Sequence, residues 1–334
     1  MFGFLCSLWS MIDCLLSTST WLAVNLGVPI LALYFTLRSY MALTNGRCLS
    51  KRQMRGKTVI ITGANSGLGF ETAKDMALRG ARVIMACRNM AKAEIAREAV
   101  LQATGAKSSY VILKKLDLAS LRSVRSFALD ILQTEKRLDV LINNAGLSDP
   151  KRTERTEDNL EYNMACNHFG HFLLTNLLLD LLKTSAPSRI VVVSSMAHVG
   201  GDVSPDALRG IGRKKWQIYS DTKLANIVFA EELSRRLAGT NVTVNSLHPG
   251  VVATEFMQHI PNELAKTVAK TMVGLFKTPE EGAQTQIHLA VSEEVEGVTG
   301  KYFSDCKPAR VWNSQSHDRA LAAKVWRISE ELTN

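Results

Sequence analysis

Tyr219 and Lys223 are the pair of side chains in this chain best suited to proton transfer. On a helix, side chains four positions apart lie on one face, one turn above another. A fixed ammonium favours the phenolate, so Lys223 would draw the phenol from a pKa of about 10 toward neutrality. Such a phenol can give or take the proton that accompanies hydride transfer to a carbonyl. A solvated helix face is the alternative interpretation, so the pair needs support from its surroundings.

A glycine-rich segment supports a chemical role: Thr62-Gly63-Ala64-Asn65-Ser66-Gly67-Leu68-Gly69. It follows an apolar, β-branched run at residues 57–61 that is typical of a buried strand, and precedes a helical pattern at residues 70–78. Glycines in a strand–turn–helix context let the backbone approach a pyrophosphate, and the helix N-terminus offers free N–H groups. A tight turn is the alternative. In this context the segment predicts a dinucleotide site.

Three further polar segments each follow an apolar run: Asn143-Asn144-Ala145-Gly146, Ser194-Ser195 and His248-Pro249-Gly250. Ligands of open parallel sheets bind at the edge where the strands end.

A parallel sheet with helices on both faces is expected, because strand and helix patterns alternate from residue 57 onward. The expected strands are residues 57–61, 82–86, 110–116, 138–142, 189–193, 241–247 and 301–303. The expected helices are residues 70–78, 90–104, 121–134, 160–183, 220–238 and 279–291, with a polar surface helix at 318–332.

The residues after the second strand, Ala86-Cys87-Arg88-Asn89, address the choice of cofactor. An acidic residue at this point would accept hydrogen bonds from the adenosine ribose and select NAD. The planar guanidinium of Arg88 instead suits a 2′-phosphate, and Lys92 could assist. A surface arginine is the alternative. We therefore expect NADP(H).

The ordered set of motifs, from about residue 55 to residue 304, resembles the short-chain dehydrogenase/reductase superfamily. This resemblance implies a Rossmann-type α/β fold with a doubly wound parallel sheet of about seven strands. It implies that Tyr219 is the general acid/base and that Lys223 holds the nicotinamide ribose and lowers the Tyr219 pKa. Ser195, rather than Ser194, matches the serine that binds the substrate oxygen, and Asn167 matches an asparagine that supports a water relay.

The resemblance also implies the NADP(H) contacts, among them Asp117 at the adenine and Thr254 at the nicotinamide carboxamide. The expected cofactor-binding residues are Gly63, Asn65, Ser66, Gly67, Leu68, Gly69, Arg88, Asn89, Asp117, Leu118, Asn144, Ala145, Gly146, Tyr219, Lys223, Pro249, Gly250, Val252 and Thr254. No metal site is expected. The four histidines His168, His171, His198 and His248 lack a ligand-type spacing and are interpreted as structural or as neighbours of the site.

The substrate is predicted from local strings at residues 167–175, 223–226, 248–252 and 300–306. These strings resemble the microsomal retinol dehydrogenases that act as NADPH-dependent retinal reductases, and an orphan dehydrogenase/reductase branch close to them. An apolar stripe at residues 256–276 suits either a lid over a lipophilic substrate or a helix packed on the core. Retinol/retinal is the expected pair. A steroid or fatty-aldehyde carbonyl reductase and a non-catalytic, nucleotide-binding membrane scaffold are the alternatives.

The N-terminal segment predicts a membrane anchor. Residues 1–37 carry one charged side chain, Asp13, and the apolar run at 21–37 approaches the ~20 residues that cross a bilayer. The basic residues that follow would keep the catalytic domain in the cytosol. A cleaved signal peptide is disfavoured because no cationic region precedes the apolar run. We expect the endoplasmic reticulum membrane, with lipid droplets as an alternative.

Four regions follow: an anchor at 1–45, a basic linker at 46–56, the NADP(H)-binding domain at 57–310 and a helical tail at 311–334. Six cations between Arg38 and Lys57 contribute to the net charge of +9 and suit anionic lipid headgroups. No folded basic patch with base-reading residues suggests a nucleic-acid partner. The six scattered cysteines suit a reducing compartment. The sequence leaves the oligomeric state open, with a homodimer as one outcome.

Overall fold

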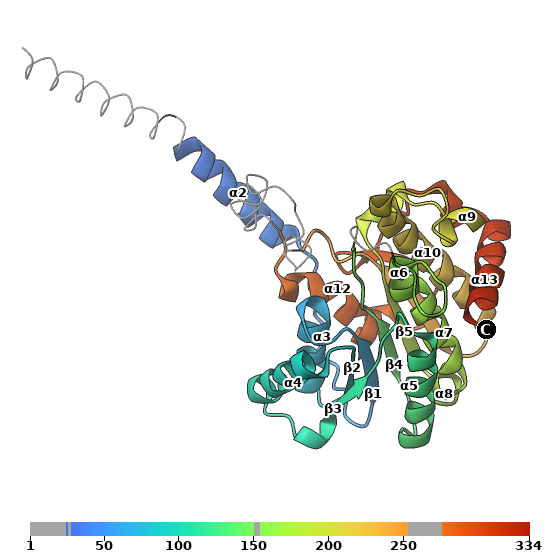
Figure 1. The fold of residues 1–334 in the computed structure, drawn as a ribbon. Coiled ribbons are helices and arrows are strands. Elements are labelled where there is room, and N and C mark those ends of the chain that lie inside the picture. The colour runs from blue at the N-terminus through green and yellow to red at the C-terminus, as the bar shows by residue number, and fades with distance from the viewer. Residues whose placement is uncertain (1–24, 26–27, 150–153, 253–275) are drawn as a thin grey trace, which may run out of the picture. The chain divides into compact units, whose positions relative to one another are not determined.

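The computed structural model describes residues 25, 28–149, 154–252 and 276–334 (Figure 1). The chain divides into two compact units, residues 1–45 with 267–276 and residues 46–266 with 277–334. The larger unit contains the described β-sheet.

The sheet has eight strands in the order β3-β2-β1-β4-β5-β6-β7-β8. Neighbouring strands from β3 to β7 are parallel, and β8 runs antiparallel to β7. The strands are β1 Thr58–Thr62, β2 Arg82–Cys87, β3 Val111–Lys115, β4 Val140–Asn143, β5 Ser188–Val193, β6 Val242–Leu247, β7 Tyr302–Ser304 and β8 Lys307–Pro308. All five residues of β1 are buried, as expected for a central parallel strand covered on both faces.

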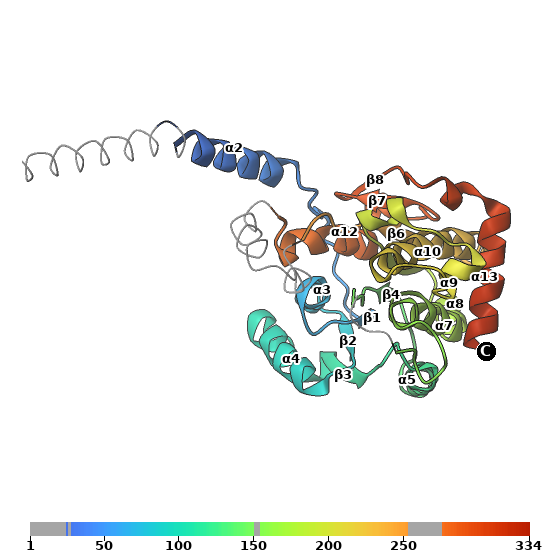
Figure 2. The same ribbon diagram turned by 45° about the horizontal axis from the view of Figure 1, so that its top comes forward.

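Helices cover both faces of the sheet (Figures 1 and 2). The helices of this unit are α3 Gly67–Leu78, α4 Met90–Thr104, α5 Leu121–Thr134, α6 Tyr162–Met164, α7 Gly170–Leu177, α8 Leu179–Thr184, α9 Pro205–Leu208, α10 Lys215–Arg236, α12 Pro279–Val291 and α13 Arg319–Thr333. Val59 and Ile61 of β1 pack with α3, α4 and α12, whereas Ile60 packs with α5, α7, α10 and α13. Alternate residues of one strand therefore supply two separate cores.

Two elements differ in detail from what the sequence predicts. The seven expected strands form the parallel part of the sheet, and a two-residue eighth strand is added to it. Asp305 and Cys306 take positive φ angles of 50° and 60° and turn the chain back into this antiparallel strand, β8. The helix expected at 160–183 is interrupted by a π-helical segment, Ala165–Phe169, and by a break at Leu178. Hydrophobic periodicity cannot detect a π turn, since it inserts one residue into an otherwise regular pattern.

The C-terminal helix is not the polar surface helix that its composition suggests. Trp326 of α13 is 5 % exposed and packs on Phe172 and Phe229, at ring-centroid distances of 4.9 and 6.0 Å. The Arg236 guanidinium covers the same indole at 4.0 Å. One apolar stripe therefore fastens α13 to α7 and α10.

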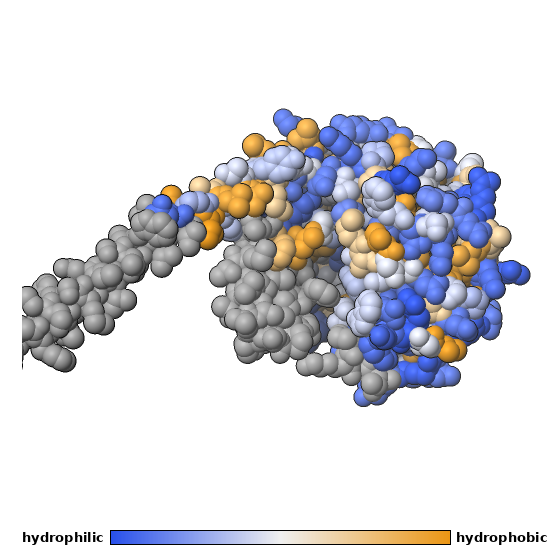
Figure 3. Space-filling model, turned by 90° about the horizontal axis from the view of Figure 1, so that it is seen from above, coloured by the Kyte–Doolittle hydropathy of each residue, from blue (hydrophilic) through white to orange (hydrophobic). Residues whose placement is uncertain are grey.

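In the smaller unit, α2 spans Val28–Thr44 and exposes large apolar side chains, including those of Leu31, Leu33 and Phe35. Its described surface is mainly hydrophobic in Figure 3. No helix within the described residues is both long and apolar enough to cross a membrane. Most of the predicted anchor, residues 1–24 and 26–27, lies outside the described part of the chain.

Candidate active site

The candidate site lies where the winding of the sheet reverses. β1 pairs with β2 on one side and with β4 on the other, so the chain leaves β1 and β4 in opposite directions across the sheet. A crevice opens at the carboxyl edge of such a pair. Thr62 ends β1 and Asn143 ends β4, which brings the glycine-rich segment beside the Asn-Asn-Ala-Gly segment.

The glycine-rich turn is packed too tightly for side chains. A Cβ atom on Gly69 would lie 2.4 Å from the Gly63 carbonyl oxygen and 2.6 Å from Asn144 Nδ2. Gly63 has a φ of +67°, which strains a side-chain-bearing residue. Ser66 precedes α3 without capping it through its side chain, so the first N–H groups of that helix have neither a side-chain cap nor an intrahelical acceptor. Asn65, Gly67 and Leu68 complete this turn.

Thr62 anchors the neighbouring segment. Its Oγ1 accepts hydrogen bonds from the backbone N–H groups of Asn144 and Ala145, each at 2.9 Å. Asn144 Nδ2 donates in return to the Thr62 carbonyl at 2.8 Å. The sequence motif contained Thr62, but its role was missed, because nothing local shows that its hydroxyl meets a segment 82 positions away.

Helix α10 carries Tyr219, and the phenol is hydrogen-bonded to the Ser195 hydroxyl. The neighbouring Ser194 is buried, and its hydroxyl donates to the Lys223 carbonyl at 2.7 Å. Adjacent residues at the end of a strand point to opposite faces. Ser195 is therefore the serine that faces the phenol, while Ser194 holds the helix against β5.

The Lys223 ammonium is buried at 3 % exposure and lies 5.5 Å from the centre of the Tyr219 ring. Its Nζ donates to the Val193 carbonyl at 3.5 Å, and burial lowers the Lys223 pKa to about 8. A Cβ on Gly146 would lie 2.9 Å from Nζ, so a side chain at this position would displace the ammonium.

The Tyr219 pKa is not drawn toward neutrality in this structure, and the contribution of Lys223 to it stays a prediction. Burial raises the pKa of Tyr219 above its usual value of 10.0, and the hydrogen bond with Ser195 acts in the opposite direction. Burial disfavours the phenolate form of Tyr219, just as it disfavours the charged form of Lys223.

Asn167 lies in the π-helical segment and is fully buried. Its side chain forms two hydrogen bonds with the backbone of Leu147. Oδ1 accepts from the Leu147 N–H at 2.9 Å, and Nδ2 donates to the Leu147 carbonyl at 2.8 Å. Nδ2 also lies 3.1 Å from the Thr222 hydroxyl, next to Lys223. The side chain therefore joins the segment after β4 to α10.

The residues expected at the adenosine end gather around the ends of β2 and β3. Arg88 is exposed and donates from Nη1 to the Tyr162 hydroxyl at 2.5 Å. Asn89 caps α4 by accepting the Lys92 N–H at 3.0 Å. Asp117 Oδ1 accepts the Ala119 N–H at 3.0 Å, and Leu118 is buried.

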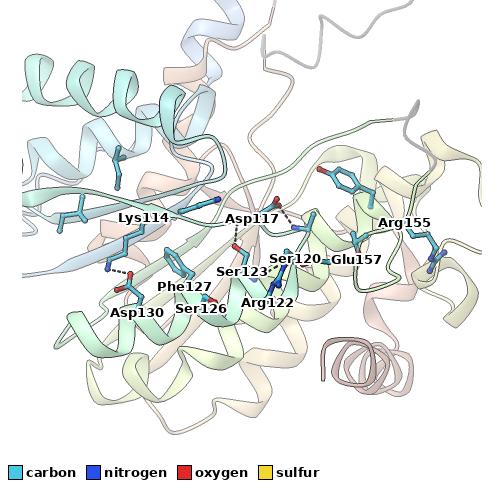
Figure 4. A pocket seen from close by; sticks show the side chains of 16 residues that line it. Lys114, Asp117, Ser120, Arg122, Ser123, Ser126, Phe127, Asp130, Arg155 and Glu157 are labelled. Atoms are coloured by element: carbon cyan, nitrogen blue, oxygen red, sulfur yellow. Dashed lines mark hydrogen bonds and ion pairs between the residues drawn. The ribbon is translucent and has the colours of Figure 1, made fainter.

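A hollow of about 960 Å³ adjoins Asp117, between β3, the start of α5 and residues 155–157 (Figure 4). Its walls carry charges of both signs, such as Lys114, which pairs with Asp130. Ser195, Tyr219 and Lys223 are absent from its lining. We therefore assign no substrate to this hollow.

The residues expected at the nicotinamide end follow β6. Gly250 has a φ of +86°, and a Cβ there would lie 2.9 Å from Lys277 Cε. Val252, just beyond Pro249 and Gly250, forms an isolated parallel β-bridge with Lys277. The buried Lys277 side chain forms an ion pair with the partly exposed carboxylate of Asp305. Thr254 and the apolar stripe up to residue 275 lie outside the described residues.

These features fit a nicotinamide dinucleotide. A single Cβ at Gly69 would fill the space at the glycine turn, and the uncapped start of α3 offers N–H groups. The buried Lys223 cation adjoins the half-buried phenol of Tyr219. Backbone N–H groups suit the pyrophosphate, and the phenol suits proton exchange.

Comparisons with known proteins agree with this geometry. A family model described as short chain dehydrogenase matches residues 57–265. The chain is 53 % identical over 290 residues to mouse retinol dehydrogenase 14, covering 84 % of this chain and 86 % of that protein. It is 43 % identical over 323 residues to human retinol dehydrogenase 11, covering 92 % and 98 % of the two chains.

Among solved structures, an uncharacterized protein from Mycobacterium paratuberculosis is similar with a TM-score of 0.67 and 34 % identity, covering 86 % of this chain and 97 % of that one. A Shigella flexneri structure described as a short chain dehydrogenase complexed with NADP has a TM-score of 0.60 and 25 % identity, covering 77 % and 100 %.

Proposed function

The chain belongs to the short-chain dehydrogenase family and is an oxidoreductase acting on CH–OH groups, and we propose that it uses NADP(H) to interconvert retinol and retinal. The observation that carries the chemistry is the buried Lys223 ammonium 5.5 Å from the centre of the Tyr219 ring, with Ser195 acting to lower the Tyr219 pKa. The retinoid is proposed because the relatives at 43–53 % identity are named retinol dehydrogenases.

A bound nicotinamide dinucleotide supplies or accepts the hydride. Ser195 and Tyr219 would both hydrogen-bond the substrate oxygen, and the negative charge that develops on it is stabilised by these preorganised donors. Tyr219 gives its phenolic proton to that oxygen in reduction and takes it back in oxidation. Lys223 stabilises the phenolate that remains. The hydrogen bonds from the Asn167 side chain to the Leu147 backbone keep the neighbouring Gly146 next to the ammonium.

Turnover of all-trans-retinal tests the proposal. Membranes containing the full chain are incubated with retinal and NADPH beside a Tyr219→Phe variant. Loss of the phenolic hydroxyl should lower turnover by about 10²–10⁴-fold, the usual contribution of a general acid. Tyr110→Phe, at an exposed tyrosine before β3, is the matched control and should keep full activity.

Turnover that survives in Tyr219→Phe would contradict the mechanism. Reduction of a steroid or a fatty aldehyde but not of retinal would replace retinal with that compound class as the proposed substrate. No turnover on any of the three classes would favour a non-catalytic, nucleotide-binding membrane scaffold.

The preference for NADP(H) is proposed from Arg88, an exposed guanidinium next to Asn89 at the start of α4. Such a planar donor suits a 2′-phosphate. We expect Arg88→Asp to bind NADH more tightly than NADPH, reversing the native order, as measured by fluorescence titration. Arg319→Asp makes the same charge change at an exposed position on α13 and should leave the order unchanged. Equal native affinities for both dinucleotides would count against NADP(H).

A membrane location is proposed from the exposed apolar side chains of α2 and the cations between Arg38 and Lys57. We propose attachment to the endoplasmic reticulum, with the catalytic unit in the cytosol and retinal reaching it from the bilayer. Intact microsomes treated with protease test this orientation: the catalytic unit should be digested. Protection of that unit would place it in the lumen, and recovery with lipid droplets would change the proposed organelle.

A further inference from the structure

We propose that His171 is a positioning residue that joins the carboxyl end of β1 to the backbone carbonyl of Asn167. This inference rests on the oxidoreductase activity of the family and not on retinal as the substrate.

The imidazole of His171 lies between two fixed oxygens. Its Nε2 is 2.9 Å from Thr62 Oγ1, and its Nδ1 is 3.2 Å from the Asn167 carbonyl oxygen. The ring is 1 % exposed. A carbonyl oxygen can only accept, so Nδ1 carries the proton and donates to Asn167. Nε2 of the neutral ring is then an acceptor, and the Thr62 hydroxyl donates to it.

The Thr62 hydroxyl is fully used by this arrangement. It accepts from the Asn144 and Ala145 N–H groups at 2.9 Å and has one proton to donate. The other acceptor in reach is the Ile142 carbonyl at 3.4 Å, a longer contact than the one to His171. His171 therefore sets the direction of the hydroxyl that holds the segment after β4.

The other end of the bridge is the π-helical segment. The Asn167 side chain is committed to Leu147 and Thr222, whereas its backbone carbonyl accepts from His171. A Cβ on Gly146 would lie 3.7 Å from Asn167 Oδ1 and 2.9 Å from Lys223 Nζ. Through His171, the Thr62 hydroxyl at the end of β1 is connected to the backbone of Asn167 in the π-helical segment.

The charge state of His171 excludes an acid–base role. Burial lowers its pKa to about 3, and the Lys223 charge acts in the same direction. The ring is therefore neutral throughout the pH range of catalysis, and its contribution is geometric.

Two amide substitutions separate the two ends of the bridge. The His171→Asn side chain can place an amide N–H near Nδ1 but falls short of Thr62, whereas His171→Gln can place an amide oxygen near Nε2. We expect His171→Asn to weaken dinucleotide binding by roughly 5- to 100-fold, the effect of leaving a buried polar group unpaired. We expect His171→Gln to keep most of that affinity and to lower kcat by a similar factor.

The matched control is His288→Asn, which removes another buried imidazole, on α12. This variant should lower the free energy of unfolding, but it should not change dinucleotide affinity and kcat by different factors. Affinity is titrated with both NADPH and NADH, so this readout stands even if retinal is not the substrate. The ratio of native to His171→Gln turnover should stay constant from about pH 6 to pH 9, because the native imidazole does not titrate there.

Thr62→Val provides a test if the His171 variants do not fold, since it removes the same hydroxyl with little change of shape. It should weaken dinucleotide binding at least as much as His171→Asn does, because it also removes the acceptor of the Asn144 and Ala145 N–H groups. Adding His171→Asn to Thr62→Val should weaken binding little further, because the bond between the two side chains is already broken. Unchanged affinity in Thr62→Val, equal losses of affinity and kcat in both His171 variants, or a ratio that changes with pH would overturn the proposal.

Discussion

Lys223→Met is expected to make the protein more stable while abolishing its activity. The Lys223 pKa is about 8 in the folded protein, against an ordinary 10.5, because burial disfavours the charged form. At about 1.4 kcal/mol for each pKa unit, this difference corresponds to about 3 kcal/mol of destabilisation near neutral pH. Methionine has a similar length and carries no charge, so it fills the same space without this cost. Such a gain is typical of replacing a functional group that is buried for catalysis.

The pH dependence identifies the cause. Below pH 8 Lys223 is protonated in both states, and the whole penalty is present. Between about pH 8 and 10.5 the unfolded chain binds more protons at this site than the folded chain, so native stability rises relative to the variant. The advantage of Lys223→Met should therefore fall from about 3 kcal/mol at pH 7 to about 1 kcal/mol at pH 10.

Urea unfolding of the full chain in detergent, at pH 7 and at pH 10, measures this difference. Lys324→Met makes the same substitution at an exposed position of α13 and should show no gain that depends on pH. A Lys223→Met variant that is no more stable than the native protein at pH 7, or a gain of equal size at both pH values, would refute the reasoning.

Three other changes have definite expected outcomes. Gly69→Ala should weaken dinucleotide binding at least about tenfold, because a methyl group would meet the Gly63 carbonyl at 2.4 Å; an unchanged dissociation constant in a titration would contradict a dinucleotide site at the glycine turn. Trp326→Ala should lower the free energy of unfolding by about 3–5 kcal/mol, and a loss below about 1 kcal/mol in urea would mean that α13 is not fastened to the core. Ser195→Ala should lower kcat by about 10²-fold and Ser194→Ala should not; the reverse order in steady-state assays would exchange their roles.

The sequence predicted those parts of the fold and the site that depend on residues close together in the chain. The buried strand at β1, the glycine turn after it and the strand-to-helix alternation all follow from neighbouring residues. The α/β class and the family follow from the order of the motifs, which the family model matches over residues 57–265. The sequence did not predict the π segment at Asn167 or the β7–β8 turn, because both depend on backbone geometry that leaves no periodic signal.

The sequence by itself determined which side chains belong to the chemistry: the spacing of Tyr219 and Lys223 is a property of one helix. Only the tertiary structure decided their electrostatics, because the exposure of Lys223 depends on Val193 and Gly146, residues far away in the chain. The partnership of Thr62 with His171 likewise spans 109 positions. Burial and long-range hydrogen bonds arise only when strands from distant parts of the chain end at one edge of the sheet.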